Sequence, residues 1–96
     1  MKEAGSGTIT RLREEPSTLV VEADILSRMD VAADPETSDE LLTMLSRDRS
    51  DFVRRAVAEN PVTPPHVLDL LTTDEDENVR FAAAETLSAV YYCQAI

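Results

Sequence analysis

The chain has 96 residues, of which 43% are hydrophobic and 4% aromatic, and it contains no Trp. This is the size of a single domain with one aliphatic core. Nine Lys and Arg against nineteen Asp and Glu give a formal net charge of −10. That charge opposes direct binding to nucleic acid or anionic lipid, because both depend on basic side chains, and it favours a partner protein with a basic face.

The sequence also indicates where the chain works. No stretch has the length of a membrane span, and the N-terminus lacks the apolar core of a signal peptide. Cys93 is the only cysteine, which excludes an internal disulfide and a thiolate metal cage. We therefore expect a cytoplasmic protein without membrane contact.

Residues 1–16 mix Gly, Ser and charged side chains and predict a flexible N-terminal tail. The alternative is a short extended segment that docks on the helices or on a partner. Residues 17–96 form the single domain. Both glycines precede residue 8, whereas a β-rich domain needs Gly in its turns, so we expect helices.

A first helix is predicted over residues 18–32, because apolar side chains recur there at helical spacing and Ser17 can serve as the N-cap. Its β-branched residues leave a strand as the alternative for part of it. Residues 17–33 end in the same way as the repeats described next. We therefore interpret them as a degenerate repeat that caps the stack.

The most informative feature is that residues 34–59 repeat as residues 60–85 without a gap. A tandem period of this length predicts stacked helical repeat units. Ten positions are identical: Pro35/Pro61, Thr37/Thr63, Leu42/Leu68, Leu45/Leu71, Asp48/Asp74, Val53/Val79, Arg54/Arg80, Ala56/Ala82, Ala58/Ala84 and Glu59/Glu85.

Each copy predicts two helices. The first helix is short, which favours 3₁₀ character. In the first copy Thr37 and Glu40 form a capping box. In the second copy Thr63 keeps the cap and Pro64 takes the first helical position, where its missing amide costs nothing.

The second helix of each copy begins at another pair of acidic residues. We expect Asp48 and Asp74 to be the caps, supported by an acidic residue three positions later. Four side chains of the first copy are predicted to face inward: Phe52, Val53, Ala56 and Val57.

The two copies are expected to end differently. Asn60-Pro61 stops the second helix of the first copy, because a residue before Pro is pushed out of the α region. No proline follows Glu85, so residues 86–96 should extend the last helix to about Tyr92.

The segment Asn60-Pro-Val-Thr-Pro-Pro-His-Val-Leu-Asp-Leu-Leu, with Asp74 and then Val79-Arg80-Phe81-Ala82-Ala83-Ala84, resembles the leucine-rich repeat variant family. More loosely it resembles HEAT-like helical repeats. The resemblance implies a short right-handed α-solenoid of about five stacked helices, with α and 3₁₀ helices alternating, and a surface that binds other macromolecules. One family member carries an iron–sulfur cluster on an N-terminal Cys-rich segment. That cofactor is not carried over, because this chain has no cysteine before position 93.

The densest run of charge is Asp74-Glu75-Asp76-Glu77. Its position predicts a solvated helix cap first and a contact for a basic partner second. A metal site ranks last, because the run lacks the central Gly and the ligand spacing of a calcium loop.

Arginines recur at a fixed offset in the repeats. Arg54 and Arg80 are expected to form a ladder that bonds carboxylates or helix-end carbonyls of the neighbouring repeat. Arg47, Arg49 and Arg55, next to Arg54, form a local basic patch that an anionic partner would touch.

No catalytic set can be assembled from the remaining residues. His66 has neither a second His nor a Cys at ligand spacing, and no Gly-rich phosphate loop exists. We expect no enzyme activity, no metal and no cofactor. At the C-terminal end, Tyr91 and Tyr92 lie in an uncharged segment, which predicts either packing back on the stack or a homodimer through the last helix.

The leading functional hypothesis is a non-enzymatic protein-interaction module, an adaptor or scaffold whose acidic surface binds a basic face of another protein. The alternative is a small acidic inhibitor that mimics a nucleic-acid backbone and blocks a nucleic-acid-binding protein. A third hypothesis is a scaffold that self-associates through the C-terminal helix.

Overall fold

The computed structural model describes residues 24–95, and side chains as far as residue 91. The predictions for the tail at 1–16 and for Ser17 as a cap lie outside the described residues. The prediction of one helix over residues 18–32 is wrong at its start: the described helix begins at Ile25, because Asp24 has an extended backbone and its side chain caps the helix by accepting from the Ser27 amide at 2.9 Å. Within residues 24–95 the chain forms five α-helices and no strand. They are α3 (Ile25–Ala33), α4 (Asp39–Leu45), α5 (Asp51–Glu59), α6 (Pro65–Leu71) and α7 (Glu77–Ala95).

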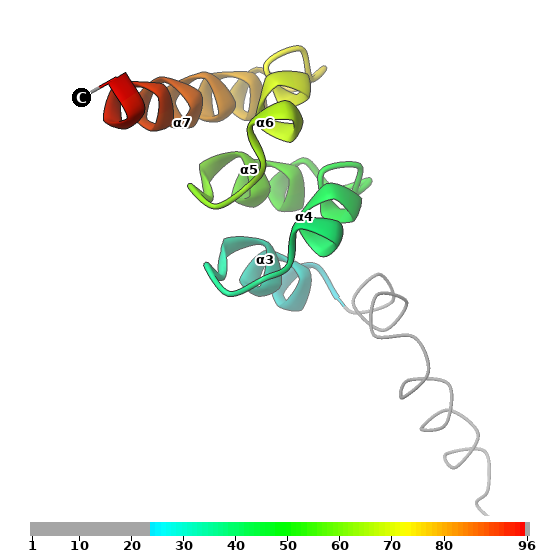
Figure 1. The fold of residues 1–96 in the computed structure, drawn as a ribbon. Helices are drawn as coiled ribbons and strands as arrows, with labels where there is room; N and C mark the ends of the chain where they lie inside the picture. The colour runs from blue at the N-terminus through cyan, green and yellow to red at the C-terminus, as the bar shows by residue number, and fades with distance from the viewer. Residues whose placement is uncertain (1–23, 96) are drawn as a thin grey trace, which may run out of the picture.

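The helices lie in two rows (Figure 1). In the first row α5 packs between α3 and α7, and in the second row α4 and α6 sit against the helices that follow them in the chain. The helix pairs of the two repeats therefore lie side by side. The predicted all-helical fold with five helices is confirmed.

The alternation of α and 3₁₀ helices is not seen in the described part of the chain, where α4 and α6 are α-helices of seven residues each. Tighter i→i−3 bonds instead close the turn after each of them. The amide of Asp48 donates to Leu45 O at 3.0 Å, and the amide of Asp74 donates to Leu71 O at 3.1 Å.

The core is aliphatic, as the composition predicts. It is shared by the helices of the first row and the inward faces of α4 and α6, so burying one stripe of each helix joins the repeats. The buried cluster consists of Ala32, Leu45, Val53, Ala56, Val57, Ala58, Val67, Leu71, Val79, Ala82 and Ala83. Phe52 does not belong to it: contrary to the prediction, its side chain is 56% exposed.

The predicted N-caps of the short helices are wrong by one residue. Ser38 caps α4 by accepting from the Leu41 amide at 3.2 Å, and α6 begins after Pro64 with no side-chain cap. The reason is that the Thr hydroxyls bond elsewhere. Thr37 Oγ1 donates to Val31 O at 2.6 Å, and Thr63 Oγ1 donates to Val57 O at 2.8 Å.

The helix ends follow the proline pattern. Helix α5 ends at Glu59 before Asn60-Pro61, and α7 continues through the equivalent position to Ala95. The predicted difference between the two copies is confirmed, because the backbone bond that proline removes in one copy can form in the other.

Candidate functional site

The repeats are joined by two equivalent ion pairs, each between an arginine of one repeat and an aspartate twenty residues further on. Arg28 of α3 donates to Asp48 through Nε at 2.8 Å and through Nη2 at 3.1 Å. Arg54 of α5 donates to Asp74 in the same way, at 2.9 and 3.2 Å. We call these pairs the Arg–Asp ladder. The prediction that Arg54 bonds the neighbouring repeat is confirmed. The same prediction for Arg80 is wrong among the described residues, because its Nη1 donates to Asp74 O and Glu75 O of its own repeat.

The ladder pairs are largely removed from water. The exposed fractions of the side chains are 2% and 7% in the Arg28–Asp48 pair, and 11% and 10% in the Arg54–Asp74 pair. The hydrogen bond to Asp74, assisted by the negative charge around it, raises the pKa of Arg54 above its ordinary value despite burial. The guanidinium therefore stays charged and holds both aspartates, since its Nη1 also donates to Asp48 O at 2.8 Å.

Sequence reasoning assigned Asp48 and Asp74 to helix capping, and this prediction is wrong. The side-chain caps are Ser50, which accepts from the Phe52 amide, and Asp76, which accepts from the Val79 amide at 3.1 Å. The two ladder aspartates instead accept from an arginine and from the amide two residues later. Their carboxylates lie just before the helix start, within reach of the preceding repeat.

Asn60 joins the first-row helices by a second polar link that sequence reasoning missed. Its side chain is buried, and its Nδ2 donates to Ala32 O at 2.9 Å and to Asp34 O at 3.1 Å. Only an amide can donate here, because an ionised carboxylate is an acceptor alone. The sequence carried a signal for this link, because Asp34 in the first repeat is replaced by Asn60 at the equivalent position of the second. Asn60 is buried, whereas Asp34 is exposed.

The acidic run 74–77 divides into structural and exposed residues. Asp74 is held by Arg54, and Asp76 caps α7. Glu75 is 90% exposed, although its Oε2 lies 3.9 Å from Arg54 Nη2, and Glu77 is exposed in the first turn of α7. Two of the four predicted partner-binding carboxylates are thus available to a partner.

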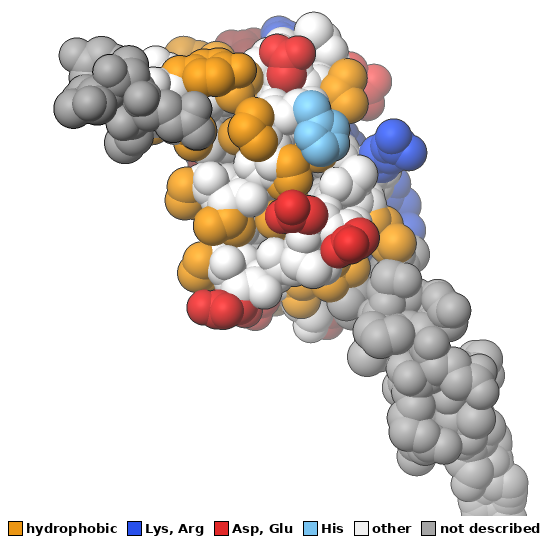
Figure 2. Space-filling model, viewed as in Figure 1, with side chains coloured by type: hydrophobic (Ala, Val, Ile, Leu, Met, Phe, Trp, Pro, Cys, Tyr) orange, Lys and Arg blue, Asp and Glu red, His pale blue; other side chains and the backbone are white. Residues whose placement is uncertain are grey.

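Of the predicted basic patch, Arg54 is buried in the Arg–Asp ladder, whereas the other three arginines are exposed. Arg47 and Arg49 are exposed in the turn after α4 and line a surface hollow of about 570 Å³ together with Met44. Arg55 lies on α5 and pairs with Glu59 at 3.0 Å, with both side chains about half exposed. On the face shown in Figure 2, acidic side chains are spread among uncharged ones, whereas basic side chains are visible mainly at the right edge, with one more at the top.

The turns after α4 and α6 carry opposite charge at equivalent positions. Arg47 and Arg49 in the first repeat correspond to Thr73 and Glu75 in the second. Since the turns are equivalent in the two repeats, this surface has a basic half and an acidic half. The exposed charge of these turns therefore changes from positive in the first repeat to negative in the second.

The remaining predicted residues are not brought into a site. Tyr91 is 58% exposed on α7, Tyr92 lies in the same helix, and the homodimer through this helix stays a prediction. His66 is exposed on α6. Among residues 24–95 no group of three or more His, Cys, Asp or Glu side chains is placed to hold a metal ion. The helices described lack the combined length and apolarity needed to cross a bilayer.

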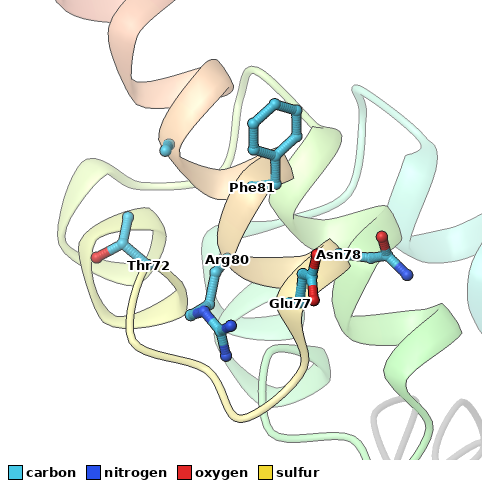
Figure 3. Close-up of a pocket in the computed structure, with 6 residues that line it drawn as sticks. Thr72, Glu77, Asn78, Arg80 and Phe81 are labelled. Carbon is cyan, nitrogen blue, oxygen red and sulfur yellow. The ribbon is translucent and has the colours of Figure 1, made fainter.

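A hollow at the end of the stack was also missed. It measures about 590 Å³ and is lined by residues of α7 and by Thr72 (Figure 3). Arg80 and Phe81 are both among the lining residues, and their side chains leave α7 in different directions.

A family model described as the Leucine Rich Repeat Variant domain matches residues 28–87. The matched segment begins at the first arginine of the Arg–Asp ladder and contains both repeats. No curated protein and no solved structure matches the chain.

Proposed function

Because the chain belongs to the Leucine Rich Repeat Variant domain family, we propose that it is a non-enzymatic interaction module whose acidic surface binds a basic face of a partner protein. The observation that carries the proposal is the charge left on the surface after the internal pairs are formed. The ladder withdraws two arginines and two aspartates from the surface. The other basic residues of the described chain are Arg47, Arg49, Arg55 and Arg80.

Many more carboxylates than arginines remain outside the ladder. In the described part of the chain these carboxylates belong to Asp24, Asp30, Asp34, Glu36, Asp39, Glu40, Asp51, Glu59, Asp69, Glu75, Asp76, Glu77 and Glu85. Such an excess raises the rate at which a basic protein finds this surface and lowers its tendency to bind acidic ones.

The turn before α7 is the part of this surface best suited to a specific contact. Glu75 and Glu77 are exposed, yet they are attached to a segment whose backbone is fixed by Asp74 and Asp76. A carboxylate on a fixed backbone loses less entropy on binding than one on a mobile loop. Arg47 and Arg49, in the turn after α4, would pair with acidic residues of the same partner and so fix how the partner is aligned along the stack.

The test uses affinity capture from extracts of the native cell at low and at high salt, followed by identification of the retained proteins. We expect retention of a protein with a basic surface that is lost at high salt, because exposed charge pairs are screened over about 8 Å at physiological ionic strength. The double variant Glu75→Gln/Glu77→Gln should lose the partner.

The matched control, Glu36→Gln/Glu85→Gln, removes the same charge from other exposed positions and should retain it. Equal binding by both variants would contradict the assignment of the surface. Retention that is insensitive to salt would contradict the electrostatic proposal as a whole. Displacement of the partner by duplex DNA would instead support the inhibitor that mimics a nucleic-acid backbone.

A further inference from the structure

The third arginine of the series lacks the carboxylate that the other two have. Arg80 occupies the position of Arg28 and Arg54 one period later, and its Nη1 donates to Asp74 O at 2.8 Å, as Arg54 Nη1 does to Asp48 O. The guanidinium of Arg80 is therefore held by the backbone carbonyl six residues before it, as the guanidinium of Arg54 is. Within the described residues, however, no carboxylate forms an ion pair with Arg80, whose side chain is exposed.

The helix face around Arg80 is also uncovered. Ala32, Ala58 and Ala84 are equivalent positions, and each of the first two is 0% exposed because the next helix of the row packs over it. Ala84 is exposed. The face of α7 that carries Ala84 and Arg80 therefore corresponds to the face of α5 that α7 covers.

This face has the shape and chemistry of a partner site. The hollow of about 590 Å³ is lined by both Arg80 and Phe81, whose ring is 68% exposed, and the two side chains leave α7 in different directions (Figure 3). Phe81 replaces Arg55 of the preceding repeat, so the second repeat presents an aromatic ring where the first presents a charge. Arginine and exposed aromatic side chains are among the residue types that contribute most to protein interfaces.

We propose that this end face of α7 binds a segment of another protein that presents an aspartate in the turn before a helix. The carboxylate would accept from Nε and Nη2 of Arg80, as Asp74 does from Arg54, and the helix behind it would cover Ala84, as α7 covers Ala58. The Arg28–Asp48 and Arg54–Asp74 pairs show that an arginine at this position of the repeat can bind an aspartate of the next unit in this way.

A protein segment fits this site better than a free anion or a phosphate group. Glu77 lines the same hollow, and a doubly charged phosphate would be repelled by it. An aspartate brings one negative charge in the planar form that a guanidinium binds with two parallel hydrogen bonds.

The test is a titration of the full chain with a synthetic peptide that copies residues 60–85, the unit that engages Arg54. Binding is followed by the NMR signals of the arginine Nε–H groups. We expect the Arg80 Nε–H signal and the amide signals of Phe81 and Ala84 to shift saturably. The Arg54 signal should stay in place, because its carboxylate is already bound.

Control peptides and variants separate the site from general attraction. A peptide with Asp74→Asn should bind at least about tenfold more weakly. The variant Arg80→Lys keeps the charge but loses the two-pronged donor and should weaken binding by a similar factor. Arg55→Lys should leave it unchanged. Thermal melts followed by circular dichroism establish that each variant is folded.

Three results would overturn the proposal. The first is an Arg80 signal that does not move at about 1 mM peptide, which would place the Kd well above that concentration. The second is equal binding of the Asn peptide, which would show that the carboxylate is not recognised. The third is a dimer in light scattering that Arg80→Gln dissociates, which would make a second copy the occupant.

Discussion

Replacing Asp74 by Asn tests whether the Arg–Asp ladder holds the repeats together. Asn keeps the shape of the side chain and the oxygen that accepts from the Asp76 amide, but it removes the charge that Arg54 faces. The two hydrogen bonds of 2.9 and 3.2 Å would become weak or be lost. Because the two side chains are only 11% and 10% exposed, the guanidinium would remain largely buried without a counter-charge.

Removing one partner of a buried pair costs about 3–5 kcal/mol. The residual exposure and the remaining bond to Asp48 O favour the lower end, about 3 kcal/mol. A domain of this size loses about 4–8 °C of Tm per kcal/mol, so we expect a fall of about 12–24 °C. Thermal and urea unfolding followed by circular dichroism measure both quantities.

The control is Glu75→Gln, at the adjacent position. Glu75 also lies near Arg54, but it is 90% exposed, so its removal should cost no more than about 0.5 kcal/mol. In the double variant Arg54→Met/Asp74→Asn no unpaired charge is left, and its loss should be smaller than the sum of the single losses. If Asp74→Asn is no more destabilised than Glu75→Gln, the ladder does not stabilise the stack and the reasoning is refuted.

Three further expectations concern the other polar link, a helix cap and the end of α7. Asn60→Asp should lower the free energy of unfolding, measured in urea, by about 2–3 kcal/mol, because it replaces a buried donor by an acceptor that faces two carbonyls. Asp34→Asn, at the exposed equivalent position, should leave the free energy of unfolding almost unchanged. The amide hydrogen bond from Ser27 holds the pKa of Asp24 below 3.8, so its stabilisation is present above that pH and is lost as the pH falls through the lower, folded-state pKa. The stability difference between wild type and Asp24→Ala should accordingly vanish in strong acid, and a constant difference would contradict the capping role. Thr86→Asn/Leu87→Pro restores the stop signal of the first copy and should remove about half of α7 from the helical circular dichroism signal, with melting of the remaining stack unaffected if residues 86–95 form a separate extension.

The functional predictions differ in how far the structure supports them. Of the acidic run, Glu75 and Glu77 are exposed as a partner site requires, whereas Asp74 is already paired. The basic residues were predicted as one patch because they are close in sequence. In the structure Arg54 is buried in the Arg–Asp ladder, Arg47 and Arg49 line one hollow, and Arg55 pairs with Glu59 on α5.

The sequence by itself determined the architecture of this protein. A 26-residue period in aliphatic, arginine and proline positions is enough to specify helix pairs that bury one stripe each, and the presence or absence of proline determined where α5 and α7 end. These are properties of local spacing and backbone chemistry, which can be read along a chain.

Only the tertiary structure decided which oxygen each polar side chain meets. Near the start of α5 the chain offers Asp48 and Ser50, two acceptors separated by two residues, and local rules allow either to cap the helix. The choice depends on Arg28, which lies twenty residues before Asp48 and can bond it only after α3 and α5 have packed together. The tertiary structure also decides whether Arg80 is paired with a carboxylate, because this depends on which element packs beside α7.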